Sequence, residues 1–102
     1  MTRAFFLVAS TVAIAAAVGM SGQQPATSAA EVARGAAVFG DRCASCHGPG
    51  GIGGDRGPTL ANSRRVRGLG DAELQNIIRS GTPNGMPPFA LPPDDLRGVT
   101  AF

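Results

Sequence analysis

The chain has 102 residues, which is enough for one domain, and it carries a formal net charge of +2 with 43% hydrophobic residues. Half of that charge comes from Arg3 near the N-terminus, so residues 31–102 are close to neutral, with eight arginines and seven acidic residues. This balance lacks the basic footprint of a nucleic-acid-binding protein, and we expect no nucleic-acid partner.

Residues 1–19 have the pattern of a secretory signal peptide. Arg3 is the only charged residue before Glu31, and residues 4–18 are almost entirely apolar. A positive start, an apolar stretch and small residues after it are typical of an export signal. An uncleaved anchor is the alternative, because residues 4–20 reach the lower length limit for crossing a bilayer. We therefore expect an exported, periplasmic domain that is attached to the membrane only if this segment is retained.

The folding unit predicted from the composition is residues 31–102. Residues 20–30 are small and polar, and they predict a flexible linker or a remnant of the leader. Thirteen glycines and seven prolines fall among the 72 residues that follow. A unit this short and this rich in glycine seldom builds a stable core unaided, so it needs a covalent or cofactor staple.

The pattern of apolar residues predicts helices and no strand. Apolar residues recur at helical spacing over residues 31–42 and again over 71–80, where we expect Asp71 to cap the first amides and Gly81 to end the helix. A last helix is expected to begin at Pro93, with acidic residues in its first turn. Glycine- and proline-rich loops separate these segments, so the sequence predicts an all-α fold.

Residues 43–47 read Cys-Ala-Ser-Cys-His, which is the C-x-x-C-H pattern of haem c attachment. Cysteines three apart on a helical turn point the same way, so both sulfurs can reach the two vinyl groups along one porphyrin edge. His47 then lies beneath the ring, where an imidazole nitrogen can ligate the iron. The motif predicts one haem c bound covalently through Cys43 and Cys46.

Other readings of these residues fit less well. Two cysteines in an exported protein could form a disulfide, and a C-x-x-C pair could be a thioredoxin-type redox centre, but the latter needs a βαβ setting that is missing here. Zinc needs four ligands, and the chain offers two cysteines and one histidine. Residues 48–53 fit the G-x-G-x-x-G pattern, yet no strand precedes them, so we expect no nucleotide there.

Met86 is the candidate for the second axial ligand. His47 is the single histidine, so bis-histidine ligation within the chain is excluded, and Met1 and Met20 precede the folding unit. Met86 lies in the loop 82–91, where glycine permits close backbone approach and prolines stiffen the chain. Ligation by histidine and methionine raises the reduction potential and closes the iron to outside ligands, which favours electron transfer over catalysis.

Residues 31–102 resemble a small bacterial class I c-type cytochrome. The resemblance includes CASCH at 43–47, GPTL at 57–60, RSGTPNGMPPF at 79–89 and LPPDDL at 91–96. It implies the class I cytochrome c fold, in which three to four helices wrap around one covalently bound haem with long glycine and proline loops. It also implies a monomeric electron carrier rather than an enzyme.

The resemblance assigns roles beyond the two ligands. Pro58 would offer its carbonyl to the second ring nitrogen of His47 and fix the orientation of that imidazole. Leu60 would pack on the haem. The crossing of the first and last helices would involve Gly35, Phe39 and Phe102.

We expect the iron to cycle between ferric and ferrous states as the protein moves electrons between redox partner proteins, namely a respiratory donor and an oxidase or dehydrogenase. Arg64, Arg65 and Arg67 form a short basic cluster, which we interpret as a solvated turn. The same cluster could instead steer a partner or pair with a haem propionate.

Two alternatives to a free carrier stay open. The last helix stops at Phe102, a turn or two short of the length usual in the family, which is also expected if the domain is the haem module of a larger oxidoreductase such as a quinoprotein-type dehydrogenase. The other alternative is a gas or redox sensor in which Met86 is a labile ligand.

Overall fold

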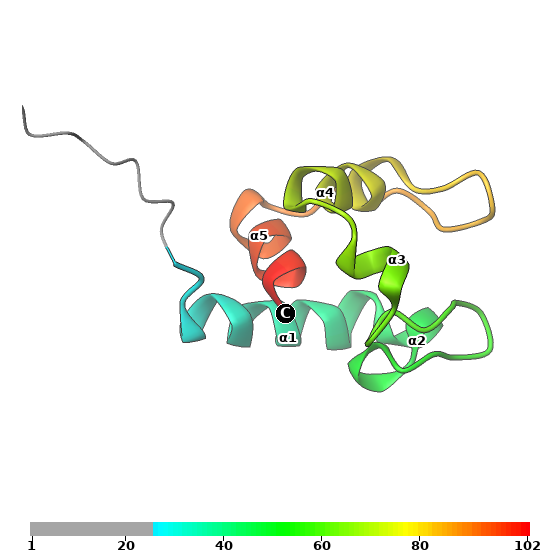
Figure 1. Ribbon diagram of the computed structural model, residues 1–102, viewed down its shortest axis with the longest axis horizontal. Coiled ribbons are helices and arrows are strands. Elements are labelled where there is room, and N and C mark those ends of the chain that lie inside the picture. Colours follow the sequence, from blue (N-terminus) through cyan, green and yellow to red (C-terminus); the bar gives the residue numbers. More distant parts are fainter. Residues whose placement is uncertain (1–25) are drawn as a thin grey trace, which may run out of the picture.

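The computed structural model describes residues 26–102, and the predicted signal peptide at 1–19 lies outside this range. The described part contains no strand, which confirms the all-α prediction (Figure 1). The three longer helices correspond to the three predicted from the sequence. The elements are α1 (Ala29–Arg42), α2 (Ala44–His47), the 3-10 turn η1 (Pro49–Gly51), α3 (Arg64–Arg67), α4 (Asp71–Ser80) and α5 (Pro93–Ala101).

Helix α1 begins two residues before Glu31, where the sequence predicted its start. Ser28 caps the helix, because its hydroxyl oxygen accepts a hydrogen bond from the backbone N–H of Glu31 at 3.1 Å. Glu31 itself lies in the first turn, where a carboxylate is favoured by the positive end of the helix. The last two residues of the predicted linker, residues 29–30, are therefore helical.

Helices α4 and α5 begin where they were predicted to begin. The expectation that Asp71 caps α4 is wrong, because Gly70 occupies the cap position and Asp71 is the first helical residue. Its charge still lies at the positive end of the helix. Gly81 ends α4 with a positive φ of 70°, as predicted. Pro93 is the first residue of α5, where a backbone N–H would make no hydrogen bond within the helix, so the lack of one in proline costs nothing.

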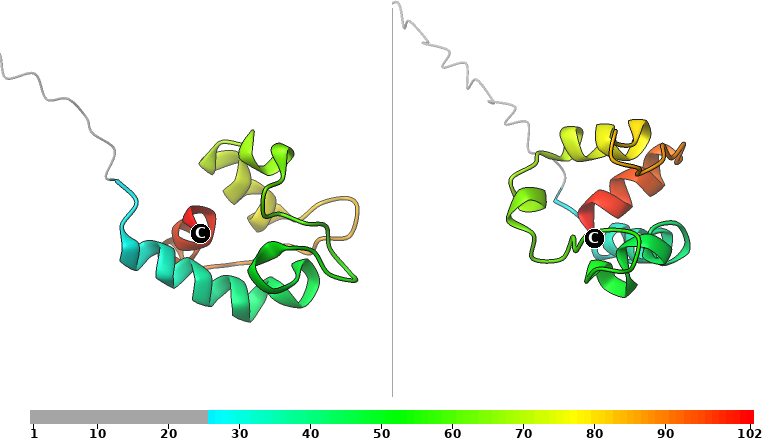
Figure 2. Two further views of the ribbon diagram at one scale, coloured as in Figure 1. Left: turned by 60° about the horizontal axis from the view of Figure 1, so that its bottom comes forward. Right: turned by 90° about the vertical axis from the view of Figure 1, so that its right-hand side faces the viewer.

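The core forms where α5 crosses α1 (Figures 1 and 2). A Cβ added at Gly35 would lie 1.8 Å from the carbonyl oxygen of Gly98, so the two helix backbones touch at this point. Beside the crossing, the rings of Phe39 and Phe102 pack with their centroids 5.5 Å apart. These contacts confirm that Gly35 and Phe39 meet the last helix and that Phe102 is the aromatic partner.

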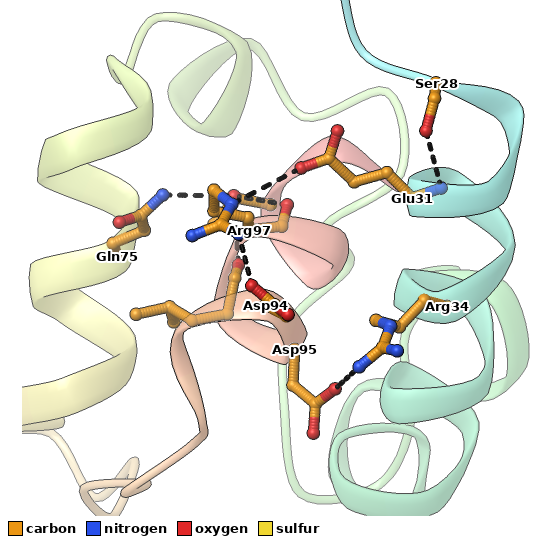
Figure 3. A network of polar contacts seen from close by, with 9 residues as sticks. Ser28, Glu31, Arg34, Gln75, Asp94, Asp95 and Arg97 are labelled. Atoms are coloured by element: carbon orange, nitrogen blue, oxygen red, sulfur yellow. Dashed lines mark hydrogen bonds and ion pairs between the residues drawn. The ribbon is translucent and has the colours of Figure 1, made fainter.

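Ion pairs add to this interface (Figure 3). Arg34 lies 3.0 Å from Asp95, and Arg97 contacts Asp94 and lies 3.8 Å from Glu31. All five side chains are partly exposed to solvent, so each pair contributes about 0–1 kcal/mol. Two of these pairs, Arg34–Asp95 and Arg97–Glu31, join α1 to α5, and Arg97–Asp94 lies within α5.

The predicted haem ligands lie away from the start of α1. Helix α2 follows the C-terminal end of α1, and the loop 81–92 projects from α4 toward this same end of the molecule (Figures 1 and 2). Helix α4 with its loop lies on one side of this end, and α2 lies on the other. The fold thus brings the two motifs that carry the predicted ligands to one end, on opposite sides.

Candidate haem site

Cys43 interrupts the path from α1 to α2. Its backbone has φ −120° and ψ −34°, and its N–H still donates to the carbonyl of Phe39 at 2.9 Å. The carbonyl oxygen of Cys43 then accepts hydrogen bonds from the amides of Cys46 and His47 at 3.1 and 3.0 Å. A single turn of helix therefore holds both cysteines and the histidine. Both thiols are free and half-buried.

Burial raises the pKa of the Cys43 thiol, while the charge of the neighbouring Arg42 acts in the opposite direction. The thiol is therefore neutral at neutral pH. Cysteines that act as redox nucleophiles have a lowered pKa instead. This electrostatic setting disfavours a thioredoxin-type redox pair.

His47 is the buried polar residue of the motif, with 8% of its surface exposed. Its Nδ1 lies 2.9 Å from the carbonyl oxygen of Pro58. Because a carbonyl can only accept, Nδ1 carries a proton and donates it, and in the neutral imidazole of this tautomer the lone pair lies on Nε2. No hydrogen bond engages Nε2 within residues 26–102. This nitrogen is free to bind a metal ion.

Glycines let the following loop close against the motif. A Cβ at Gly57 would lie 2.9 Å from both His47 Nδ1 and the carbonyl oxygen of Cys46. Gly48 has a φ of 80°, and a Cβ there would lie 2.1 Å from the carbonyl oxygen of Gly53. Larger residues at either position would push the loop away from His47. The glycine run thus serves tight packing around the motif, and it follows helix α2 rather than a strand.

The loop that carries Met86 is fastened to α4. Thr82 donates its backbone N–H to the carbonyl of Met86 at 2.9 Å, and its hydroxyl accepts from the Met86 N–H at 3.3 Å. The loop ends with the N–H of Phe89 bonded to the carbonyl of Ile78 at 2.9 Å. Gly81 allows this closure, since a Cβ there would lie 2.4 Å from the Met86 carbonyl oxygen. Met86 is half-buried.

The apolar side chains around this end are incompletely buried. Within the described residues, the buried large hydrophobics are Phe39, Ile78 and Leu96. Many others keep part of their surface open to solvent, although a chain this short needs every apolar contact it can form. A large flat apolar group packed against them would cover this surface, so the residues present fit a haem. The half-buried residues are Leu60, Val66, Leu69, Leu74, Ile77, Met86, Phe89 and Leu91.

A metal site built only from histidine, cysteine and acidic side chains does not fit. Residues 26–102 contain no group of three or more such side chains placed to hold an ion. Met86, in a separate segment, carries a thioether sulfur, which is a type of ligand that haem iron accepts.

Leu60 lies next to the C-x-x-C-H motif, and the three arginines of the basic cluster lie on the separate helix α3. The amide of Leu60 donates to the carbonyl of Gly51 at 2.8 Å, which ties this residue to η1, next to the motif. The three arginines lie on the one-turn helix α3, which Ser63 caps. All three are exposed, in agreement with a solvated turn.

Sequence reasoning missed one contact between the two sides of the site. The guanidinium carbon of Arg42, the last residue of α1, lies 6.0 Å from the centroid of the Phe89 ring in the Met86 loop. This distance is within the range of a cation–π interaction. The two residues are far apart in the sequence, so no local pattern indicated the pair.

Comparison with known proteins agrees with this geometry. Residues 30–102 match the sequence profile of the family described as "Cytochrome C oxidase, cbb3-type, subunit III". The solved structure of the KustC0563 c-type cytochrome has a similar fold, with a TM-score of 0.58 and 24% sequence identity. The match covers 66% of this chain and 89% of that one. No curated protein matches the sequence.

Proposed function

Because the chain belongs to the cytochrome c family described as cbb3-type oxidase subunit III, we propose that it passes single electrons between redox partner proteins outside the cytoplasm. The family binds haem c covalently and transfers electrons, generally as a carrier. The finer proposal is that this chain is a monomer with one haem, whose iron is ligated by His47 and Met86.

Each predicted site residue has a role in this proposal. Cys43 and Cys46 would hold the haem covalently: each thiol would add across one vinyl group, with the sulfur bonding one carbon and the thiol proton moving to the other, so no oxidant would be needed. His47 would hold the iron through Nε2, and Met86 would hold it through its sulfur. Haem held by these residues would supply one-electron redox chemistry between a donor and an acceptor.

The observation that carries the proposal is the state of His47. The Pro58 carbonyl accepts a hydrogen bond from Nδ1–H at 2.9 Å, which orients the ring and, in the neutral imidazole, places the lone pair on Nε2, the nitrogen that would bind iron. The same hydrogen bond makes the imidazole more electron-rich. Leu60 would cover the haem from the adjoining loop.

A mass measurement on the denatured protein tests the covalent attachment. Protein expressed with its leader and recovered from the exported fraction should carry one haem per chain after denaturation. Changing Cys43→Ser and Cys46→Ser together should abolish that added mass. A chain that is exported without haem would overturn the proposal, and haem that washes out on denaturation would overturn the role of the cysteines.

The location outside the cytoplasm rests on the leader pattern and on the family. Cytochromes of the c type are typically exported, and their partners dock through small, transient contacts. Within residues 26–102, no helix has both the length and the apolarity needed to span a bilayer.

A second candidate function is suggested by the family description itself, which names a subunit of an oxidase. In this reading the domain delivers electrons inside a larger oxidoreductase. Purification of the protein from membranes without cross-linking distinguishes the subunit hypothesis from the free-carrier hypothesis. Comigration with an oxidase or dehydrogenase at fixed stoichiometry would favour the subunit, and a free monomer that exchanges electrons with several partners would favour the carrier.

The exposed cluster of Arg64, Arg65 and Arg67 on α3 offers a test of partner steering. We expect Arg65→Ala to slow electron exchange with an acidic partner at low salt and to leave haem content unchanged, because an exposed charge acts mainly on the association rate. Stopped-flow mixing at several salt concentrations measures this. An equal loss of haem content would show that Arg65 is structural instead.

A further inference from the structure

The two sides of the candidate haem site belong to different parts of the fold. Cys43 and His47 continue from α1, whereas the Met86 loop closes on α4 through the hydrogen bond from the Phe89 N–H to the Ile78 carbonyl and through the pair between Thr82 and Met86. The loop therefore moves with α4. A ligand pair that holds one iron needs the distance between these sides to be fixed.

Arg42 joins the two sides. It is the last residue of α1 and precedes Cys43, and its guanidinium carbon lies 6.0 Å from the centre of the Phe89 ring. Arg42 forms no ion pair within the described residues, where Arg34 and Arg97 are the arginines that do. Its planar group is thus available for the aromatic face, which arginine stacks on well.

The chain between Phe89 and Met86 is stiff. Only Pro87 and Pro88 separate them, and each proline has its φ fixed by its ring. A shift of Phe89 is therefore passed on to Met86 instead of being absorbed by rotations of the intervening backbone.

We propose that Arg42 is a positioning residue that acts through Phe89 to hold the Met86 sulfur at the distance set by the His47 side. This inference rests on the proposed ligation by Met86. Arg42 touches neither the sulfur nor the imidazole in this role. Without the contact between Arg42 and Phe89, the Met86 loop is held less firmly relative to His47. An outside ligand then displaces the Met86 sulfur from the iron more readily.

Imidazole binding to the ferric protein measures how firmly the sulfur is held. We expect Arg42→Ala and Phe89→Leu each to tighten imidazole binding about two- to five-fold, the factor that corresponds to 0.5–1 kcal/mol for an exposed cation–π contact. The double variant should bind no more tightly than the single ones. Arg79→Ala is the matched control and should have no effect, since the Arg79 guanidinium hydrogen-bonds to Asn76 and forms no ion pair among the described residues.

Several outcomes would overturn the inference. Unchanged imidazole affinity in Arg42→Ala would do so directly. If Arg42→Ala still changed the affinity in the Phe89→Leu background, Arg42 would act by its charge on the site and not through the ring. Should Arg42→Ala fail to accumulate with haem, the same cycle is run with Arg42→Gln.

The proposed ligation by Met86 is tested independently of the role of Arg42. Met86→Ala should bind imidazole far more tightly than the wild-type protein. If these two proteins bind imidazole equally, Met86 is not the ligand, and the failure belongs to the proposed function. If Met86→Ala differs from wild type while the Arg42 and Phe89 variants do not, only the positioning role is wrong.

Discussion

The crossing of α1 and α5 and the end that holds Cys43, His47 and Met86 are stabilised in different ways. At the crossing, the backbones of α1 and α5 touch at Gly35 and Gly98, and this contact is made by the polypeptide without a cofactor. At the other end the apolar side chains are half-buried, and the contact found between the sides is one cation–π pair. The comparison teaches that the chain builds one rigid frame by itself and leaves the other to be completed by its cofactor.

This division explains how a sequence so rich in glycine can fold. The crossing buries Phe39 and Leu96, the latter with 1% of its surface exposed. Glycines elsewhere let loops close against His47 and Met86, where side chains would obstruct them. Covalent haem then supplies the apolar surface that the loops lack.

The largest effect should come from preventing haem attachment. In a protein with Cys43→Ser and Cys46→Ser, we expect amide protection to be lost around Met86 and in the loop after α2, because a chain this short rarely gains more than about 3–5 kcal/mol from its own core. Residual protection should be confined to α1 and α5. Hydrogen exchange followed by mass spectrometry measures this, and uniform loss or uniform retention would contradict the comparison.

A methyl group at the crossing should have the next largest effect. Gly35→Ala places a Cβ 1.8 Å from the Gly98 carbonyl oxygen, and we expect a loss of about 3 kcal/mol in the free energy of unfolding. Gly40→Ala is the control, since nothing lies within 4 Å of its Cβ. It should stabilise α1 by up to about 1 kcal/mol. Denaturant titration of both variants checks the pair, and equal effects would refute close backbone contact.

Removing the aromatic partner at the crossing should cost less. Phe102 is 50% exposed, so Phe102→Ala loses only the buried half of the ring and its contact with Phe39. We expect about 1–2 kcal/mol, below the 3–5 kcal/mol typical of a fully buried phenylalanine. Phe39→Ala is the matched comparison and should approach that upper range. If Phe102→Ala lowered the free energy of unfolding as much as Phe39→Ala, the Phe102 ring would have to be more buried than its 50% exposure indicates.

The smallest effect should come from the ion pairs. Arg34→Ala breaks an exposed contact with Asp95 and should lower stability by about 0.5 kcal/mol or less. The difference from wild type should vanish in 1 M salt, where the screening length falls to about 3 Å. Thermal melts at two salt concentrations measure this. A large loss that persists in salt would mean that the Arg34 stem packs the interface.

The sequence predicted the longer helices and the helical turn of the C-x-x-C-H motif, and it missed α3 for a definite reason. The apolar repeat at 71–80 and Pro93 were enough to place α4 and the start of α5. Helix α3 spans four residues, too few for a periodic pattern. The start of α1 at Ala29 has a local signal, because Ser28 and Glu31 have the spacing of a capping box, but the composition of residues 20–30 is that of a linker.

The site shows a similar contrast. The C-x-x-C-H motif is local, so Cys43, Cys46 and His47 could be identified from spacing alone. The resemblance to known cytochromes suggested that Pro58 faces His47, and the structure places its carbonyl at 2.9 Å from Nδ1. The contact between Arg42 and Phe89 depends on how α4 is placed against α1. No pattern in either segment encodes that placement.

The most direct test of the central claim is the proton NMR spectrum of the reduced protein. A methionine that ligates haem iron lies over the porphyrin face, so its methyl protons are shifted far upfield by the ring current. We predict one such resonance, present in wild type and Met20→Leu and absent from Met86→Leu while covalent haem is retained. An upfield methyl resonance that is still present in Met86→Leu, or that is absent from the wild-type protein, would contradict ligation of the iron by His47 and Met86.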